Sequence, residues 1–147
     1  MVCCPVLRKQ VGKDQKMSVD TIGDFLTIIR NGVMACKPYV YAPYSNLKHE
    51  IALLLKQEGF VRDVSVEGDT VSSKRIKIVL KYVPGESVIH DIVRISKPCR
   101  RVYEGCANLK NVIGGLGISI MTTNRGVMTN KQARELSLGG EVICTVW

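Results

Sequence analysis

Metal-binding and disulfide patterns are missing from this sequence. The 147 residues contain no Cys-x-x-Cys pair, and the only two histidines, His49 and His90, lie far from any group of cysteines. Structural zinc sites gather four such ligands at short spacings, so neither a metal ion nor another cofactor is expected. The six scattered cysteines favour reduced, mostly buried thiols in a cytosolic protein over a disulfide framework.

Long hydrophobic runs are also missing. No stretch approaches the roughly 18 apolar residues of a membrane helix, so no membrane partner is expected. The first residues lack the continuous apolar segment of a signal peptide, and Asp14 disfavours a transit peptide. Residues 1–16 have no helical or strand period and carry four basic residues against one acid, which predicts a flexible basic leader.

Acidic residues are few relative to basic ones. Thirteen Asp and Glu face 21 Lys and Arg, which gives a formal charge of +8 and a pI near 9.3. A positive surface favours nucleic acid as a partner, although many cytoplasmic proteins are mildly basic without binding it. Aromatics make up only 5%, but the 46% hydrophobic content suffices for the core of one domain or two small ones.

Recognised catalytic arrangements are absent as well. No nucleophile stands with a base, and no carboxylate pair is evident. The run Gly114-Gly115-Leu116-Gly117 lacks the lysine and Ser/Thr of a phosphate-binding loop and does not complete a dinucleotide fingerprint, so it reads as a tight turn into a strand. The protein is therefore predicted not to be an enzyme, with an enzyme of nucleotide metabolism as a remote alternative.

The N-terminal half has the pattern of helices and strands in alternation. Apolar residues at helical spacing predict a helix that Asp20 caps and Asn31-Gly32 end, and a second helix that begins at Ser45 and ends at Gly59. Strands are predicted over 39–44, at a sheet edge because of its prolines, over 60–67, and over 75–83, with a turn at Gly68-Asp69. In the last strand the side chains expected to face the core are Ile76, Ile78, Leu80 and Tyr82.

A boundary is predicted at Pro84-Gly85-Glu86-Ser87, which divides the chain into an N-terminal α/β subdomain, 17–84, and a β-rich subdomain, 85–147. Strands are predicted over 88–95, around Val102, over 117–121 and over 141–147, with a short helix over 109–113. Thr129 and Gln132 have the spacing of a capping box for a helix that ends near Leu138-Gly139. The predicted fold class is α+β, with a helix-strand-helix-strand-strand unit followed by a mainly β unit with short helices.

Polar side chains gather at two places in the second half. Thr122, Thr123, Asn124, Arg125 and Gly126 form a predicted loop whose hydroxyl, amide and guanidinium groups could contact RNA, although such a string is more often only a turn. Lys97, Arg100, Arg101 and Tyr103 could grip phosphates and stack on a base, or form a solvated basic strand. From Lys97 onward seven basic residues face three acidic ones, so +4 of the +8 lies there.

Several long motifs together resemble one known family. They are DTIGDFLTIIRNG from Asp20, SNLKHEIALLLKQEGF from Ser45, SKPCRRVY from Ser96, GLGISIMTTNRGVMTNKQAREL from Gly115 and GGEVICTVW at the end. In this order they resemble bacterial-type small-subunit ribosomal protein eight, over residues 17–147.

The resemblance implies a structural constituent of the small (30S-type) ribosomal subunit that binds the central domain of 16S-type ribosomal RNA and helps assemble the subunit platform. Implied partners are that RNA and neighbouring small-subunit proteins, in a cytoplasmic ribosome or, alternatively, an organellar one. The runner-up is a translational repressor that binds the messenger RNA of its own operon through the same surface.

RNA contacts carried over from the family fall mostly in the C-terminal part. They are Thr122, Thr123, Asn124, Arg125, Gly126, Tyr103, Arg101, Gly140 and Glu141, joined by Lys97 and Arg100 from the basic cluster, and in the N-terminal part Thr21, Arg30, Asn31, Ser45 and Lys48.

Three features depart from the family pattern. Thr122-Thr123-Asn124 replaces a usual Ser-Thr-Ser, so the third hydroxyl becomes a bulkier amide. Cys99 stands where glycine is usual, which would restrict the backbone if that position needs a positive φ. Members typically begin at Met17-Ser18, so the 16-residue leader is expected to be a lineage-specific tail or to reflect a misplaced start codon.

Overall fold

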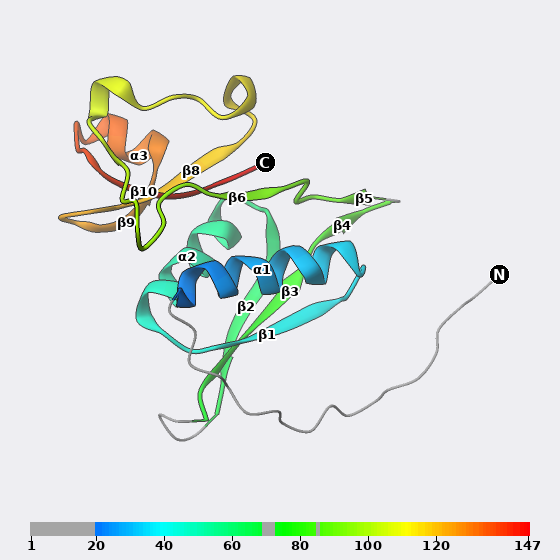
Figure 1. Ribbon diagram of the computed structural model, residues 1–147. Helices are drawn as coiled ribbons and strands as arrows, with labels where there is room; N and C mark the ends of the chain where they lie inside the picture. Colours follow the sequence, from blue (N-terminus) through cyan, green and yellow to red (C-terminus); the bar gives the residue numbers. More distant parts are fainter. Residues whose placement is uncertain (1–19, 69–72, 85) are drawn as a thin grey trace, which may run out of the picture.

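The computed structural model describes residues 20–68, 73–84 and 86–147. The predicted leader over 1–16, and Asp69 and Gly85 of the predicted turn and boundary, lie outside the described residues. The molecule contains the α+β arrangement that the sequence predicts (Figure 1).

The N-terminal unit follows the predicted order of helix, strand, helix, strand, strand. Its elements are α1 (Thr21–Met34), β1 (Tyr39–Pro43), α2 (Asn46–Gln57), β2 (Val61–Glu67) and β3 (Arg75–Leu80). The strands form an antiparallel sheet in the order β1-β3-β2, so β1 lies at an edge, as its prolines predict. Ile76 and Ile78 of β3 share one buried cluster with Phe25 of α1 and Ile51 of α2, which places both helices against one sheet face.

The start of α1 is confirmed, and its predicted end is wrong. The Asp20 side chain accepts a hydrogen bond from the Gly23 backbone N–H at 3.0 Å and caps the helix. The helix continues through Asn31-Gly32 to Met34. Gly32 is buried, and a Cβ there would lie 2.3 Å from Cγ1 of Val40. This glycine allows close helix–strand packing and does not stop the helix. In α2, Ser45 stands at the N-cap without a capping hydrogen bond from its side chain.

The predicted strand over 75–83 is interrupted. Strand β3 ends at Leu80, and after Lys81 a short strand, β4 (Tyr82–Val83), pairs with β5 (Glu86–Ser87). Ile76, Ile78 and Leu80 are buried as predicted, but Tyr82 is 38% exposed and its hydroxyl donates to the carbonyl of Lys37 at 2.7 Å. Placing Tyr82 in the core was wrong because the strand changes partners at Lys81.

The C-terminal unit is mainly β with short helices, as predicted. Its elements are β6 (Ile92–Arg94), β7 (Tyr103–Glu104), β8 (Ile118–Thr123), β9 (Gly126–Thr129), α3 (Asn130–Glu135) and β10 (Gly140–Val146). The sheet order is β6-β10-β8-β9, and β7 pairs with β10. Met121 and Met128 pack with Ala133 of α3 and with Leu109 in a second buried cluster.

Three boundaries in this unit differ from prediction. The strand expected over 88–95 is limited to Ile92–Arg94. The helix expected over 109–113 is absent; two 3-10 turns, Cys106–Asn108 and Ile113–Gly115, flank that segment. Thr129 and Gln132 form the predicted capping box, but α3 ends at Glu135, and Ser137, with φ of 53°, provides the left-handed residue expected at Gly139.

The buried side chains of the two units are continuous. Ile92, Ile118 and Ile143 belong to the same cluster as the side chains of α1 and α2. Across this contact Arg30 of α1 pairs with Asp91 at 3.5 Å and donates to the carbonyl of Ile92, and Arg94 of β6 lies 3.7 Å from Asp20.

The prediction that the thiols are mostly buried is wrong for the described cysteines, which are all free. Cys36 and Cys99 are exposed, Cys106 is half-buried and Cys144 is buried. Burial raises the pKa of the Cys144 thiol to about 12, so this side chain behaves as a small apolar group.

Candidate nucleic-acid interface

The segment predicted as a polar loop over 122–126 is a tight β-hairpin. Thr122 and Thr123 end β8, Thr123 pairs with Gly126, and only Asn124 and Arg125 form the turn. Gly126 has φ of 108°, a conformation that other residues rarely adopt. The loop prediction was wrong because the strand pairing continues up to the turn.

Thr123 holds this turn together. Its Oγ1 donates to the carbonyl of Gly126 at 3.0 Å and accepts from the backbone N–H of Arg125 at 3.2 Å. Asn124 and Arg125 are exposed at the tip, and in the described part of the chain their side chains have no hydrogen-bond partner. The turn therefore presents one amide and one guanidinium to solvent on a fixed backbone.

Adjacent threonines point to opposite faces of the sheet. Side chains alternate along a strand, and directly paired residues share a face. Thr122 pairs with Val127 and Glu141, and Glu141 pairs with Tyr103. These four residues form one row across β9, β8, β10 and β7. Thr123 lies on the other face, where its Oγ1 is 3.8 Å from the sulfur of Met128.

Glu141 anchors a basic side chain beside this row. Its Oε1 accepts a hydrogen bond from Nη1 of Arg101 at 2.7 Å and another from the hydroxyl of the buried Ser96. Burial alone would raise the pKa of Glu141, but the hydrogen bonds from Arg101 and Ser96 and the charges of Arg101 and Arg94 lower it overall. The hydrogen bond to Glu141 and the charge of Glu141 in turn raise the pKa of Arg101. Half of the Arg101 side chain stays exposed, at 49%.

The other residues of the basic cluster precede and follow Arg101 in the chain. Lys97 and Arg100 exchange two backbone hydrogen bonds of 3.0 Å, which close a turn over Pro98 and Cys99. Cys99 is not among the described non-glycine residues with positive φ, so replacing glycine there introduces no backbone strain. Lys97, Arg100 and Arg101 are exposed, and 71% of Tyr103 is exposed. The exposure of these side chains fits both interpretations made from the sequence, a group that grips phosphates and a solvated basic strand.

Gly140 brings two of these strands into close contact. A Cβ on Gly140 would lie 2.1 Å from the carbonyl oxygen of Thr122 and 3.1 Å from Cγ2 of Thr123. Gly140 therefore allows β10 to pack closely against β8. This close approach sets the distance between Glu141 and the hairpin.

The predicted N-terminal contacts are more scattered. Thr21 and Asn31 are exposed on α1. Arg30 is held by Asp91. Ser45 is half-buried, and Lys48 on α2 is only 6% exposed. Burial lowers the pKa of Lys48, and the charge of Asp24 opposes this shift.

One contributing residue was missed. Ser96 lies 45 positions from Glu141, and no spacing in the sequence connects the two. Within residues 20–68, 73–84 and 86–147, no group of three or more His, Cys, Asp and Glu side chains could hold a metal ion. None of the helices in these ranges is long and apolar enough to span a membrane.

The chain is a basic α+β protein with a polar β-hairpin and an arginine held by Glu141. These are features that suit a nucleic-acid-binding protein. A family model described as ribosomal protein S8 matches residues 20–147. The small ribosomal subunit protein uS8 of Thermosipho africanus is 52% identical over 132 residues, which cover 87% of this chain and 98% of that protein. The chain belongs to the ribosomal protein S8 family.

Other relatives are similar to the same extent. The uS8 protein of Chromohalobacter salexigens is 50% identical over 129 residues, 87% of this chain and 97% of its own. That of Baumannia cicadellinicola is 48% identical over 127 residues, 86% and 96% of the two chains. Family membership identifies a ribosomal protein without catalytic activity.

Proposed function

We propose that this protein binds the central domain of small-subunit ribosomal RNA directly, stays there as a structural component, and helps assemble the platform of the subunit. The proposal rests on the family and on one observation. Oε1 of Glu141 accepts a hydrogen bond from the half-exposed guanidinium of Arg101 at 2.7 Å. Glu141 lies in the row that also contains Tyr103 and Thr122. We define the C-terminal polar surface as Arg101, Tyr103, Thr122, Asn124 and Arg125.

The chemistry of this surface suits an RNA helix with an irregular internal region. Arg101 and Arg125 supply guanidinium groups that pair with phosphates. The Tyr103 ring can stack on an unpaired base, and the Thr122 hydroxyl and Asn124 amide can bond to sugar 2′-hydroxyls and base edges. Tyr103 and Thr122 project from paired strands, Asn124 and Arg125 from a tight turn, and Arg101 is held by Glu141, so little ordering entropy is lost on binding. Further contacts with the RNA are predicted for the N-terminal residues Thr21, Asn31, Ser45 and Lys48.

Proteins of the small subunit that lie beside the same RNA are proposed as further partners, in a cytoplasmic ribosome. The carboxylate of Glu141 would be repelled by phosphates, so its proposed role is to position Arg101 and not to contact RNA itself.

Hydroxyl-radical footprinting of complete small-subunit RNA tests this function. The full chain should protect one contiguous region of the central domain, and the double variant Arg101→Gln, Arg125→Gln should lose that protection. Lys131→Gln, an exposed residue of α3 outside this surface, is the control. Protection spread over other domains, or unchanged in the double variant, would contradict the proposal.

A further inference from the structure

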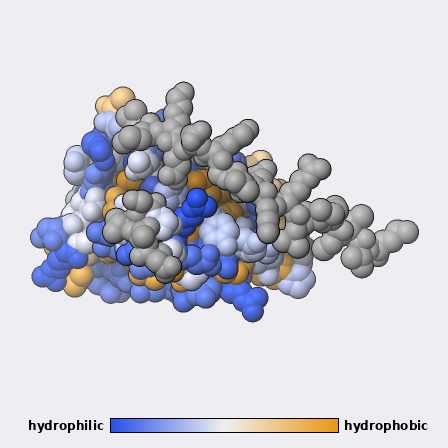
Figure 2. Space-filling model, turned by 90° about the horizontal axis from the view of Figure 1, so that it is seen from below, coloured by the Kyte–Doolittle hydropathy of each residue, from blue (hydrophilic) through white to orange (hydrophobic). Residues whose placement is uncertain are grey.

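The N-terminal sheet has a second face, turned away from α1 and α2. Alternation and register place there Tyr39, Tyr41 and Pro43 of β1, Arg75, Lys77 and Val79 of β3, and Asp63, Ser65 and Glu67 of β2. We call these nine residues the tyrosine face. None belongs to the C-terminal polar surface. Figure 2, seen from below, the side on which β1 lies in Figure 1, shows hydrophilic residues in blue along the lower rim with hydrophobic residues in orange among them.

Two aromatic rings are exposed on this face. Tyr39 is 44% exposed and Tyr41 is 42% exposed. Their ring centroids lie 5.5 Å apart in an edge-to-face arrangement. The Lys77 ammonium lies 5.3 Å from the centroid of the first ring and 5.9 Å from that of the second. Lys77 also pairs with Glu67 at 3.0 Å, so a fixed positive charge stands beside both rings.

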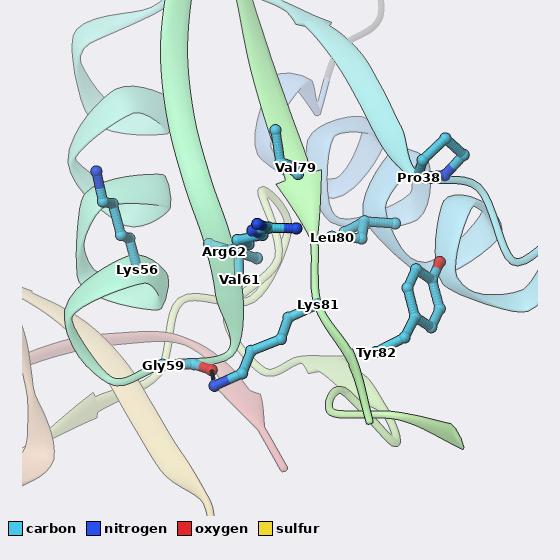
Figure 3. A pocket seen from close by; sticks show the side chains of 9 residues that line it. All are labelled: Pro38, Lys56, Gly59, Val61, Arg62, Val79, Leu80, Lys81 and Tyr82. Atoms are coloured by element: carbon cyan, nitrogen blue, oxygen red, sulfur yellow. Dashed lines mark hydrogen bonds between the residues drawn. The ribbon is translucent and has the colours of Figure 1, made fainter. Parts of the chain in front are cut away.

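A basic pocket continues from the tyrosine face. It has a volume of about 680 Å³, and its lining includes Val79, which pairs directly with Tyr39. Three cationic side chains line it, those of Lys56, Arg62 and Lys81. Figure 3 shows Arg62 reaching from β2 toward β3, and Lys81 extending to the carbonyl of Gly59 at 3.3 Å.

The charges of the face and pocket do not cancel. Among the described residues the two acids, Asp63 and Glu67, are each paired, with Lys56 at 2.7 Å and with Lys77 at 3.0 Å. Arg62, Arg75 and Lys81 are exposed and have no acidic partner in the part of the chain that the structure describes. The surface is therefore complementary to a polyanion.

We propose that the tyrosine face and its pocket bind a single-stranded segment of RNA, separately from the C-terminal polar surface. Bases stack on Tyr39 and Tyr41, and a phosphate enters the pocket beside Arg62 and Lys81. Stacking rings flanked by cations are the general means of holding single strands without reading their sequence. The unpaired cations favour RNA over an apolar protein segment, which would leave three charges without partners.

An oligouridylate of about ten nucleotides, close to the site size of single-strand-binding proteins, is the probe for this site. Its affinity for the full chain is measured by fluorescence anisotropy. The double variant Tyr39→Ala, Tyr41→Ala should bind about tenfold more weakly, whereas Tyr39→Phe, Tyr41→Phe keeps both rings and should bind within about twofold of the parent. Arg62→Gln, Lys81→Gln should weaken binding and reduce its salt dependence.

Two controls separate this site from the proposed ribosomal RNA site. In the background of Arg101→Gln, Arg125→Gln, replacing Tyr39 and Tyr41 by alanine should still weaken oligouridylate binding about tenfold, and the tyrosine variants should leave the central-domain footprint unchanged. Oligouridylate carrying 4-thiouridine should photocrosslink to the peptide that contains Tyr39 and Tyr41. Unchanged affinity of the alanine variant, crosslinks only to the C-terminal hairpin, or binding of polyglutamate in place of oligouridylate would overturn the proposal.

Discussion

The carboxylate of Glu141 and the guanidinium of Arg101, 40 residues apart in sequence, meet at 2.7 Å on the edge of the C-terminal sheet. The same carboxylate oxygen accepts a hydrogen bond from the Ser96 hydroxyl, so one half-buried acid fixes a basic side chain that is half exposed. An arginine held in this way loses less conformational freedom when it meets a phosphate than an unrestrained one does.

Replacing Glu141 should therefore weaken the binding of every RNA. Glu141→Gln removes one negative charge, which favours RNA in general, but it weakens the hold on Arg101. We expect the affinities for central-domain RNA and for a scrambled duplex to fall together by about tenfold, in the range of one lost charge-assisted hydrogen bond. Glu135→Gln, an exposed residue of α3, makes the same charge change and should lower neither affinity. Equal effects of the two variants would show that only net charge matters.

The stability that Glu141 contributes should depend on pH. Its folded-state pKa lies below the ordinary value of 4.5, so around and below that pH the unfolded chain binds more protons than the folded one. The contribution is thus present above pH 4.5 and is lost as pH falls through the lower folded-state pKa. Urea unfolding of the parent and of Glu141→Gln should give free energies that converge as pH falls in this window. A difference independent of pH would contradict the assignment.

Arg101 should contribute to binding without regard to sequence. Arg101→Gln is expected to weaken cognate and scrambled RNA alike and to reduce the slope of log affinity against log salt by about 1, because one phosphate contact is lost. Lys131→Gln should change neither quantity. A loss confined to the cognate RNA would instead make Arg101 a base-reading residue.

The two threonines should respond differently to the same substitution. Thr123→Val removes both hydrogen bonds of the turn and should cost about 1 kcal/mol of unfolding free energy as well as cognate affinity. Thr122→Val should reduce cognate affinity with little change in stability, because in the described chain its hydroxyl has no hydrogen-bond partner. Urea unfolding and RNA titration of both variants measure these effects. Equal stability of the two variants would contradict the turn geometry.

The contact of Gly140 with Thr122 should leave no room for a methyl group. Gly140→Ala places a Cβ 2.1 Å from the Thr122 carbonyl oxygen, and we expect a loss of about 1–3 kcal/mol in unfolding free energy. Gly105→Ala is the matched control, since φ there is −78° and a Cβ would meet nothing within 4 Å. Similar stability of both variants would show that β10 shifts away at no cost.

Local signals in the sequence located elements better than their ends. Asp20 and the pair Thr129 with Gln132 were recognised because capping depends on residues three positions apart. The end of α1 was misplaced because Gly32 is needed for close packing against Val40, which lies on the separate strand β1. In the same way, Tyr82 left the core because β4 changes partners, which no alternation pattern reveals.

The candidate site was predictable in composition and not in geometry. Family motifs supplied Tyr103, Glu141 and Thr122, but the register that aligns them depends on the pairing of β7, β10 and β8. Conversely, the burial of Lys48 was unexpected, because a lysine on an amphipathic helix usually lies on the solvent side. Such long-range pairings are set by tertiary packing.

A salt titration tests the central claim most directly. The affinity of the full chain for a central-domain ribosomal RNA fragment is compared with its affinity for a duplex of equal length and scrambled sequence. A preference for the fragment that persists at about 0.15 M salt is the predicted result, because hydroxyl, amide and stacking contacts are screened little by salt. Equal affinities that collapse together as salt rises would contradict specific recognition and leave only general attraction between a basic protein and phosphates.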